Sequence, residues 1–434
     1  MFLMSKWEGM TSEILKELVS QHQNEKLPRL KTLNDMYLGN HEILFQSAKE
    51  IYKPDNRIVS NFSKYIVGTF NGYFIGIPVK VVHDNEATNE YIQALNNYND
   101  YGDKNAELAK MSSIYGVAYE LLYTDDFKNI VSALVSPEEC FIVRDDTLAH
   151  DPMYAVHYYT NAKGDIVGSY FDNYNKYTFD KKYNITDEEA HGFGKIPVIE
   201  YVENEERQGL FEPVQSLINA YNKAVSEKAN DVDYFADAYL KILGAILDQE
   251  TLDELRDNRI INLEGIATDK LVVEFLEKPN ADTTQENLIN RFEKLIYHLS
   301  MVANINDENF GNSSGVALAY KLQSMSNLAM VKERKFSAAL NRRYQTIATN
   351  PTSHISEEDW VGINYTFSRN IPNNLLEETQ IAGNLAGITS KETQLKALSI
   401  VDNVQNEIKR IEEEKETTLD LFQTSAEKVI GDEE

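Results

Sequence analysis

The stretch from Asp282 to Thr349 constrains the fold more than any other part of the sequence, because it predicts two helices joined by a short loop. Between Val316 and Thr349 there is no glycine or proline, and Pro351 follows soon after. An uninterrupted stretch of this kind predicts a single helix, and at 1.5 Å per residue that helix would be roughly 50 Å long. A rod of this length is more typical of a subunit in a large assembly than of a compact enzyme domain.

The first helix of this stretch is predicted to begin at a capping box, with Thr283 as the cap and Glu286 three residues later. Its apolar residues step by three and four positions and so form one helical stripe: Leu288, Phe292, Leu295, Leu299 and Val302. The segment between the two helices is polar and contains glycine, which predicts a loop. The residues of this loop are Ile305, Asn306, Asp307, Glu308, Asn309, Phe310, Gly311, Asn312, Ser313, Ser314 and Gly315.

The rest of the 434-residue chain predicts an α+β fold. Helices are expected over residues 5–50, 61–74, 86–114, 213–238 and 375–434. Short β-type segments between residues 117 and 202 are separated by turn signals and predict one antiparallel, meandering sheet. We also expect a small α/β module over 241–280, a strand from Val361 to Phe367, and a second capping box at Thr389 and Glu392.

Charge and cysteine content exclude several classes of protein. The formal net charge is −27, and an acidic chain is a poor candidate for gripping phosphate groups, since nucleic-acid-binding proteins usually carry a basic surface. It suits solubility, self-repulsion of an unassembled subunit, or a surface past which DNA slides without sticking. Cys140 is the only cysteine and lies in an apolar run, so we expect a buried small hydrophobe rather than a nucleophile. No apolar run approaches 18 residues, and no membrane span is expected.

Motifs for nucleotide binding, zinc-dependent hydrolysis or a serine nucleophile are missing from the sequence. We therefore expect a protein that is not an enzyme and that holds neither a cofactor nor a metal. Asp125-Asp126 and Asp145-Asp146 could pair as metal ligands, but both pairs lie at predicted strand ends, where turns favour aspartate. His41 could be a ligand or an acid–base group, yet the sequence shows no partner nearby, so a structural role is favoured.

A cluster of basic residues lies on the predicted long helix. It consists of Lys321, Lys332, Arg334, Lys335, Arg342 and Arg343, with Glu333 as the one acidic residue between them. One interpretation is a basic face turned toward DNA. The other is ion pairing with acidic surfaces of neighbouring copies of the chain, which we favour because the cluster alternates with apolar residues.

Four blocks of sequence, in this order along the chain, resemble the portal protein family of long-tailed bacteriophages. The first block comprises Tyr37-Leu38-Gly39-Asn40-His41, Asn61-Phe62 and the segment from Gly72-Tyr73 to Val79. The second is Lys195-Ile196-Pro197-Val198 with the helix after Glu212-Pro213, and the third is Phe310 to Leu318. The fourth runs from Ile388-Thr389-Ser390-Lys391-Glu392-Thr393 through Val401-Asp402 to Glu413. Their order over nearly the whole chain makes the resemblance strong.

The resemblance implies a ring, typically of twelve subunits, at one vertex of the capsid, with a central channel for double-stranded DNA. The implied partners are the packaging ATPase (terminase), head–tail connector proteins, and capsid and scaffolding proteins. The implied location is the virion, after assembly in the cytoplasm of the host bacterium. The implied regions are a wing (1–210 and 316–372), two stem helices (211–240 and 281–304), a clip (241–280), a tunnel loop (305–315), and a crown with the C-terminal tail (373–434).

Two of these regions carry expectations about sites. The resemblance points the loop 305–315 into the channel, where its glycines give it conformational freedom. It has Asp307 and Glu308 but no lysine or arginine, so it would form a mobile collar that does not hold DNA tightly. In the clip, an acidic patch is expected to contact terminase and the connector proteins, or else to be a plain solvated helix face: Asp248, Glu250, Asp253 and Glu254.

Two other functions compete with this interpretation. The first is a different phage head protein, such as a structural or adaptor component. The second is a metal-dependent nuclease whose carboxylates come from distant parts of the chain.

Overall fold

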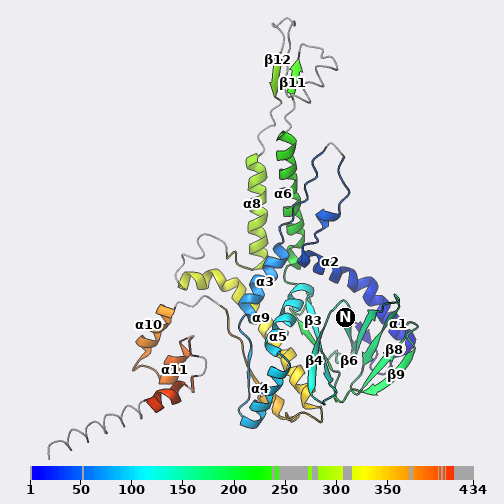
Figure 1. Ribbon diagram of the computed structural model, residues 1–434, viewed down its shortest axis with the longest axis vertical. Coiled ribbons are helices and arrows are strands. Elements are labelled where there is room, and N and C mark those ends of the chain that lie inside the picture. The colour runs from blue at the N-terminus through cyan, green and yellow to red at the C-terminus, as the bar shows by residue number, and fades with distance from the viewer. Residues whose placement is uncertain are drawn as a thin grey trace, which may run out of the picture. The chain divides into compact units, whose positions relative to one another are not determined.

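The computed structural model describes most of the chain and mixes helices with sheets, as the α+β prediction required (Figure 1). The described residues are 2–50, 53–236, 240–243, 272–275, 282–305, 315–370, 375–398, 400–401, 404–405 and 407–414. The chain divides into two compact units, of which one comprises residues 1–312 and 318–369 and the other residues 313–317 and 370–434.

The first helices begin and end where local signals place them. Thr11 caps α1 (Ser12–Gln21) by accepting the N–H of Ile14 at 3.2 Å. A π-helical turn (His22–Lys26) leads into α2 (Leu27–Leu38), which ends at Gly39 with a φ of 97°, a conformation that glycine adopts readily. The stretch predicted as helical over residues 5–50 is several shorter elements, with the break at Gly39 and Asn40 that these helix-stop residues predict. The last of these elements is a 3-10 helix, Glu42–Phe45.

Three more helices come before strand β3, and a glycine separates the last of them from that strand. They are α3 (Phe62–Ile75), α4 (Glu86–Tyr98) and α5 (Tyr101–Tyr115). Gly116 ends α5 with a φ of 87°, and a Cβ atom at this position would lie 2.0 Å from the carbonyl oxygen of Arg207. Only glycine satisfies both the positive φ and the close approach of the neighbouring backbone.

The strand-rich region forms two separate sheets. The larger one has the order β1-β5-β6-β7-β8-β9, and the smaller one the order β10-β3-β4. The larger sheet comprises β1 (Phe2–Met4), β5 (Cys140–Asp145), β6 (Pro152–Thr160), β7 (Ile166–Phe171), β8 (Asn175–Phe179) and β9 (Ile185–Ala190). The smaller sheet comprises β3 (Val117–Thr124), β4 (Ile130–Val135) and β10 (Val198–Val202).

The prediction of one antiparallel meander was therefore wrong in three respects. There are two sheets, and β1 pairs parallel to β5 with Phe2 opposite Val143. The strand β9 was missed because all of its side chains are exposed and Asp187, Glu188 and Glu189 dominate it. An edge strand without a buried face has no alternation of apolar and polar residues for sequence analysis to find.

The two faces of strand β5 supply two different cores. Phe141 and Val143 face a cluster with Leu15 and Val19 of α1, whereas Cys140 and Ile142 face a second cluster that contains residues of both sheets. Because side chains alternate between the faces of a strand, a strand buried on both sides reads as an unbroken apolar run. This explains the sequence Cys140-Phe141-Ile142-Val143 and confirms that Cys140 is buried.

The second half of the chain is mainly helical. It contains α6 (Gln215–Ala236), α8 (Asp282–Ser300), α9 (Gly315–Ala348), α10 (Leu375–Leu385) and α11 (Lys391–Lys396). Two short antiparallel pairs join distant segments, β11 (Leu240–Leu243) with β12 (Val272–Phe275) and β2 (Lys80–Val82) with β13 (Asn364–Thr366). The predicted helix at 250–257 lies outside the described residues.

The long helix is present, whereas both predicted capping boxes were misplaced. Helix α9 covers 34 residues, as its lack of glycine and proline predicted. Ser390, not Thr389, caps α11 by accepting the N–H of Thr393, and α8 starts at Asp282, one residue before the predicted cap Thr283. Helix ends are commonly uncertain by one or two residues when they are assigned from sequence.

The C-terminal half of α9 forms the centre of the first unit. The ammonium of Lys332 lies 2.6 Å from the carboxylate of Glu203 and donates to the carbonyl oxygen of Ala109 at 2.7 Å. The guanidinium of Arg343 donates to Glu120 at 2.8 Å, and both of these side chains are fully buried. Helix α9 is thereby bonded to α5, to strand β3 and to the segment that follows β10.

Both interpretations of the basic cluster were wrong for Lys332 and Arg343. These two side chains are buried and pair with Glu203 and Glu120 of the same chain, and Lys335 pairs with Glu205. Sequence spacing placed these cations on one helix correctly, but their partners come from residues more than a hundred positions away.

We predict that Lys332→Met lowers the free energy of unfolding by about 3–5 kcal/mol, since it leaves the buried carboxylate of Glu203 without its cation. The matched control is Lys335→Met, which removes a partly exposed pair and should cost less than about 1 kcal/mol. Urea unfolding followed by circular dichroism measures both values. Equal effects of the two substitutions would contradict a central role for Lys332.

Candidate functional site: the paired helices α6 and α8

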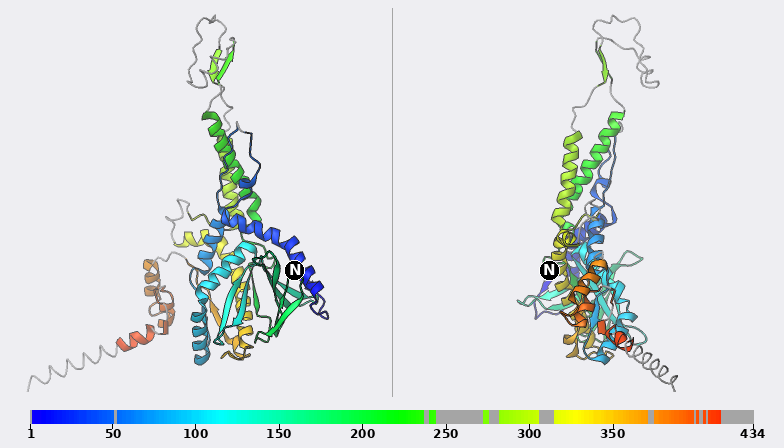
Figure 2. Two further views of the ribbon diagram at one scale, coloured as in Figure 1. Left: turned by 45° about the vertical axis from the view of Figure 1, so that its right-hand side comes forward. Right: turned by 90° about the vertical axis from the view of Figure 1, so that its left-hand side faces the viewer.

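Helices α6 and α8 run antiparallel and side by side, and β11 follows the first while β12 precedes the second (Figures 1 and 2). Lys228 of α6 pairs with Glu286 of α8, and the Gln285 amide donates to Asp231 at 2.8 Å. The helices thus contact each other along a mixed polar seam. In chain order, α6 leads into residues 237–281 and α8 follows them.

The opposite end of the helix pair is fixed to α3 by aromatic rings. Phe62 makes edge-to-face contacts with Tyr221 of α6 and Tyr297 of α8, with ring centroids 5.0 and 5.7 Å apart. The hydroxyl of Tyr65 accepts the N–H of Ile305 at 3.0 Å. Ile305 is the first residue of the predicted loop 305–315, so α3 holds the chain at the point where it enters that loop.

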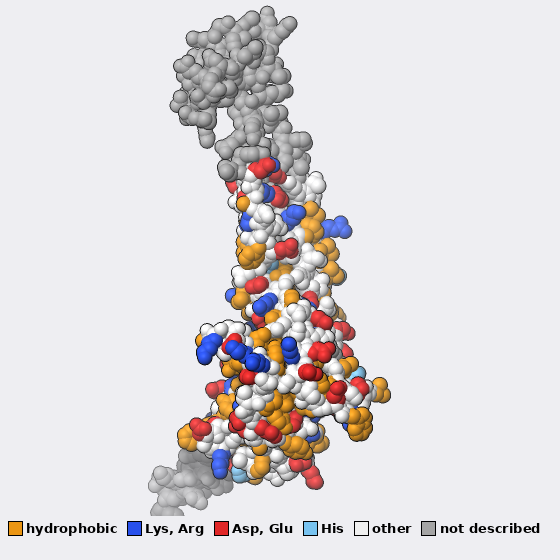
Figure 3. Space-filling view, turned by 90° about the vertical axis from the view of Figure 1, so that its right-hand side faces the viewer, with side chains coloured by type: hydrophobic (Ala, Val, Ile, Leu, Met, Phe, Trp, Pro, Cys, Tyr) orange, Lys and Arg blue, Asp and Glu red, His pale blue; other side chains and the backbone are white. Residues whose placement is uncertain are grey.

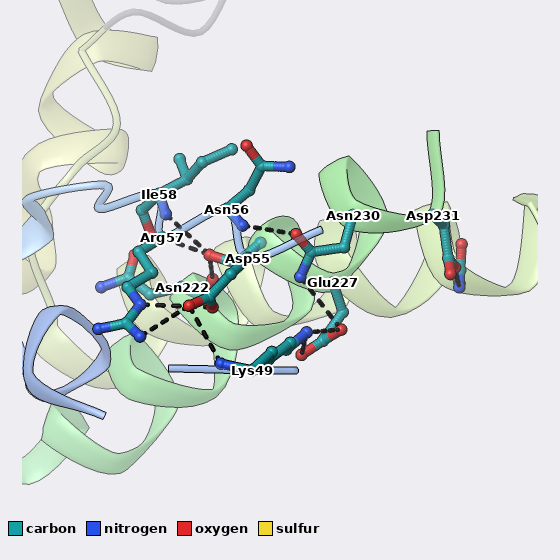
Figure 4. A network of polar contacts seen from close by, with 11 residues as sticks. Lys49, Asp55, Asn56, Arg57, Ile58, Asn222, Glu227, Asn230 and Asp231 are labelled. Carbon is teal, nitrogen blue, oxygen red and sulfur yellow. Dashed lines mark hydrogen bonds and ion pairs between the residues drawn. The ribbon is translucent and has the colours of Figure 1, made fainter. Parts of the chain in front are cut away.

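An extended segment, residues 53–60, lies along α6, and we call it the strap (Figure 4). Three of its backbone N–H groups donate to three side chains of α6: Asn56 to Asn230 at 2.6 Å, Ile58 to Ser226 at 2.9 Å, and Ser60 to Asn222 at 2.9 Å. These three acceptor side chains are buried. A helix here satisfies the backbone of an extended chain, a task that usually falls to a neighbouring strand.

These three hydrogen bonds, which we call the ladder, can form because the repeat lengths of the strap and of the helix match. Two residues of extended chain rise about 6.6 Å, and four residues of α-helix rise about 6.0 Å. Alternate amides of the strap therefore meet side chains at positions 230, 226 and 222, one helical turn apart. Lys49 and Glu227 add an ion pair of 2.9 Å, and the side-chain amide of Asn56 donates to the carboxylate of Asp233 at 2.5 Å.

The strap and α8 lie on opposite sides of α6. At about 100° per residue, Lys228 and Asp231, which contact α8, are about 200° and 140° around the helix from Ser226, which contacts the strap. Figures 1 and 2 show the same order, with α6 between the strap and α8. The helix pair thus presents two different flanks.

One flank is a line of leucines on α8, formed by Leu288, Leu295 and Leu299, which we call the α8 line. The side chains of Leu288 and Leu299 are 46% and 53% exposed. They lie eleven residues apart, close to three helical turns, and so point in nearly the same direction. The predicted apolar stripe is therefore real, but within one subunit it is only partly covered.

Most of the predicted site residues lie outside the described residues. This applies to Asn306, Asp307, Glu308, Asn309, Phe310, Gly311, Asn312, Ser313 and Ser314 of the loop, and to Asp248, Glu250, Asp253 and Glu254 of the acidic patch. Gly315 is the first residue of α9. Because Gly315 is the one described residue of this set, the structure does not test whether these residues lie together.

Among the candidate metal and catalytic residues, Asp125 and Asp145 hold turns, whereas Cys140 and His41 are buried. Asp125 accepts the N–H groups of Phe127 and Asn129, and Asp145 accepts those of Thr147 and Asp151, which confirms that both carboxylates organise turns. Burial raises the pKa of the Cys140 thiol and lowers that of the His41 imidazole. In the described part of the chain there is no cluster of three potential metal ligands and no helix suited to crossing a membrane.

A cavity of about 530 Å³ opens beside the π-helical turn, with Phe2, Phe141 and Ile142 among its lining residues. At its rim Arg144 and Arg207 both pair with Glu200, at 2.5 and 3.0 Å. Burial alone would raise the pKa of Glu200, but the hydrogen bonds and charges of these two arginines lower it below its usual value. A carboxylate held ionised in this way is a structural anchor and a poor proton donor.

Comparison with known proteins connects this architecture to one family. The family described as "Phage portal protein, SPP1 Gp6-like" matches residues 16–420. The chain belongs to this family. The portal protein of Bacillus phage SPP1 is 23% identical over 440 residues, which cover 92% of this chain and 86% of that protein. The portal protein of Clostridium phage phiCD119 is 23% identical over 411 residues, which cover 88% of this chain and 90% of that protein.

The strap was missed in the sequence of this portal family member, although a signal was present. Asn222, Ser226 and Asn230 recur every four residues on a helix whose other face is apolar. Such a polar row usually marks a solvated face, so it gave no reason to expect burial. Only the partner segment, more than 160 positions earlier in the chain, turns the row into a set of acceptors.

We predict that Ser226→Ala accelerates hydrogen exchange of the strap roughly fivefold, because one hydrogen bond of about 1 kcal/mol is lost. Alanine favours the helical state, so α6 itself should not weaken. Exchange of peptides covering residues 53–61, measured by mass spectrometry, tests this. The control is Lys223→Ala, an exposed position on the same helix; equal acceleration in both variants would show that the ladder does not hold the strap.

Proposed function

We propose that this chain is the subunit of a ring, of about twelve copies, that forms the channel for double-stranded DNA at one vertex of a phage capsid. The observation that carries the proposal is the half-exposed α8 line in a member of the portal family. An apolar line on a long helix calls for a partner, and copies of the same chain arranged around an axis would supply it. The ring would act in DNA packaging and ejection as a component of the virion.

In this proposal α6 and α8 are the stem, and the segment between them is the clip. The regions 1–210 and 316–372 are the wing, and 373–434 are the crown and tail. The clip, 241–280, would lie at one end of the stem because both stem helices lead to it. Its strands would pair between subunits, and Asp248, Glu250, Asp253 and Glu254 would contact terminase during packaging and connector proteins afterwards.

The loop 305–315 is proposed as the tunnel loop around the DNA. Its start is tied to α3 through Tyr65 and Ile305, and the helix after it is anchored from Lys332 onward. Fixed flanks with glycines between them favour motion that is confined to the loop. Asp307 and Glu308 would repel phosphate groups, so that DNA slides past without sticking.

The proposal assigns no catalytic step to this chain. Terminase would supply the energy for packaging, while capsid and scaffolding proteins would receive the ring during assembly in the host cytoplasm. This division of labour is consistent with the turn-forming roles of the aspartate pairs and with the buried, protonated thiol of Cys140.

We predict that Leu299→Asp abolishes ring assembly while the subunit still folds. Leu299 is already half exposed in one subunit, so the added charge becomes costly only when a neighbour covers it. Native mass spectrometry and electron micrographs measure assembly, and circular dichroism measures folding. The control is Asn290→Asp, which adds the same charge at an exposed position of α8. Intact rings in the Leu299 variant would argue against the stem assignment.

We also predict that Gly311→Ala combined with Gly315→Ala preserves rings but reduces DNA packaging, because alanine restricts the backbone of the loop. Packaging of DNA into proheads, measured by protection from nuclease, tests this. Ser313→Ala serves as the control and should package normally. If packaging is unchanged by the double substitution, or if ring assembly fails with it, the loop is a connector or a folding element.

A further inference from the structure

The second flank of the helix pair also exposes large apolar side chains. Just before the strap, Leu44 and Phe45 are 37% and 73% exposed, and within it Ile58 is 39% exposed. The guanidinium of Arg57 donates to the carbonyl oxygen of Leu44 at 2.9 Å, so these residues form one surface. We call Leu44, Phe45 and Ile58 the strap flank. In Figure 3 the side of the molecule that carries it faces the viewer, and exposed hydrophobic side chains lie there among charged ones.

We infer that the strap flank of one copy binds the α8 line of the next copy. This inference rests on the proposed ring and names the two surfaces that would meet in it. Because the strap and α8 lie on opposite sides of α6, a contact between the surfaces that they carry would not be self-complementary. A pair of copies would keep one free flank of each kind, so the contact would repeat from copy to copy until the ring closes.

The α8 line and the hydrogen-bonded part of the strap are similar in length. From Leu288 to Leu299 the α8 line extends about 16 Å at 1.5 Å per residue. From Asn56 to Ser60 the hydrogen-bonded part of the strap extends about 13 Å at 3.3 Å per residue. Phe45 supplies a rigid aromatic side chain of the kind that anchors protein interfaces when a pocket receives it.

The charges beside the two surfaces are complementary. Arg291 and Lys294 lie next to the α8 line in the sequence, and no salt bridge joins either of them to another described residue. Around the strap flank, Lys49, Lys53 and Arg57 pair with Glu227, Glu50 and Asp55, and the remaining charged residues Glu42 and Asp233 are acidic. A basic border would therefore face an acidic one, which favours this pairing over contacts between two like flanks.

The ladder gives the strap a second role in this arrangement. An extended segment without a neighbouring strand would not hold Ile58 in place, but the bonds to Asn222, Ser226 and Asn230 fix it against α6. The strap then acts as the outer layer of the stem. It widens each subunit so that the α8 line of the neighbour reaches an apolar surface instead of the polar row of α6.

Cysteine cross-linking tests the inference on the full-length protein. The variant carrying F45C and L299C is treated with a short bis-maleimide and run on a denaturing gel. The native thiol of Cys140 is buried and should not react. We expect a ladder of covalent multimers that extends to the full ring, because each copy bonds to two neighbours. Each single variant should remain monomeric, and a mixture of the two single variants should stop at dimers.

The matched control is F127C with L148C, at two side chains that are 84% and 101% exposed but belong to neither flank. This control should give no ladder. Rings in micrographs of the double variant without cross-links between positions 45 and 299 would overturn the inference and leave the ring proposal standing. A ladder without rings would support the contact between flanks but contradict the closed channel. Cross-linking within each single variant would indicate a two-fold contact and overturn the inference.

Discussion

The burial of two cations of α9 is the interaction on which the rest of this subunit depends. Lys332 and Arg343 bring the carboxylates of Glu203 and Glu120 into the interior, together with hydrogen bonds to α5. Charges buried in this way are costly unless every partner is in position, so they fix α3, α5, the smaller sheet and α9 in one arrangement. The half of α9 before Lys332 buries one face, at Leu322, Met325 and Ala329, and exposes Tyr320, Met330 and Val331 on its other faces.

Around these buried ion pairs, the helix pair and the strap are held by packed contacts on one side and expose apolar side chains on the other. Tyr65 and Phe62 root the helix pair in α3, and the ladder of side chains on α6 holds the strap. The outer surfaces of the same elements expose leucines and a phenylalanine that a solitary soluble protein would bury. A ring subunit is expected to combine a packed core with exposed apolar surfaces, because identical copies cover those surfaces only after assembly.

The acidity of the chain is a property of its composition, with a formal net charge of −27. The ion pairs of α9 join one cation to one carboxylate each and so leave this net charge unchanged. In the proposed channel, an acidic surface would repel phosphate and let DNA pass. The same charge would keep unassembled copies apart until the proposed contact between flanks aligns them.

The sequence by itself determined the features that depend on local spacing. The 34-residue helix, the apolar stripe on α8, the burial of Cys140 and the turns at Asp125 and Asp145 follow from patterns within a few residues, and the family follows from motifs in order along the chain. The tertiary structure decided what depends on distant partners. Examples are the division into two sheets, the strand β9 with its fully exposed side chains, the internal use of Lys332 and Arg343, and the strap on Asn222, Ser226 and Asn230. Strand β9 pairs with the neighbouring strand β8 and was missed because it has no buried face. In the other cases the deciding contact joins residues far apart in sequence, and a polar residue looks the same in the sequence whether water or a buried partner satisfies it.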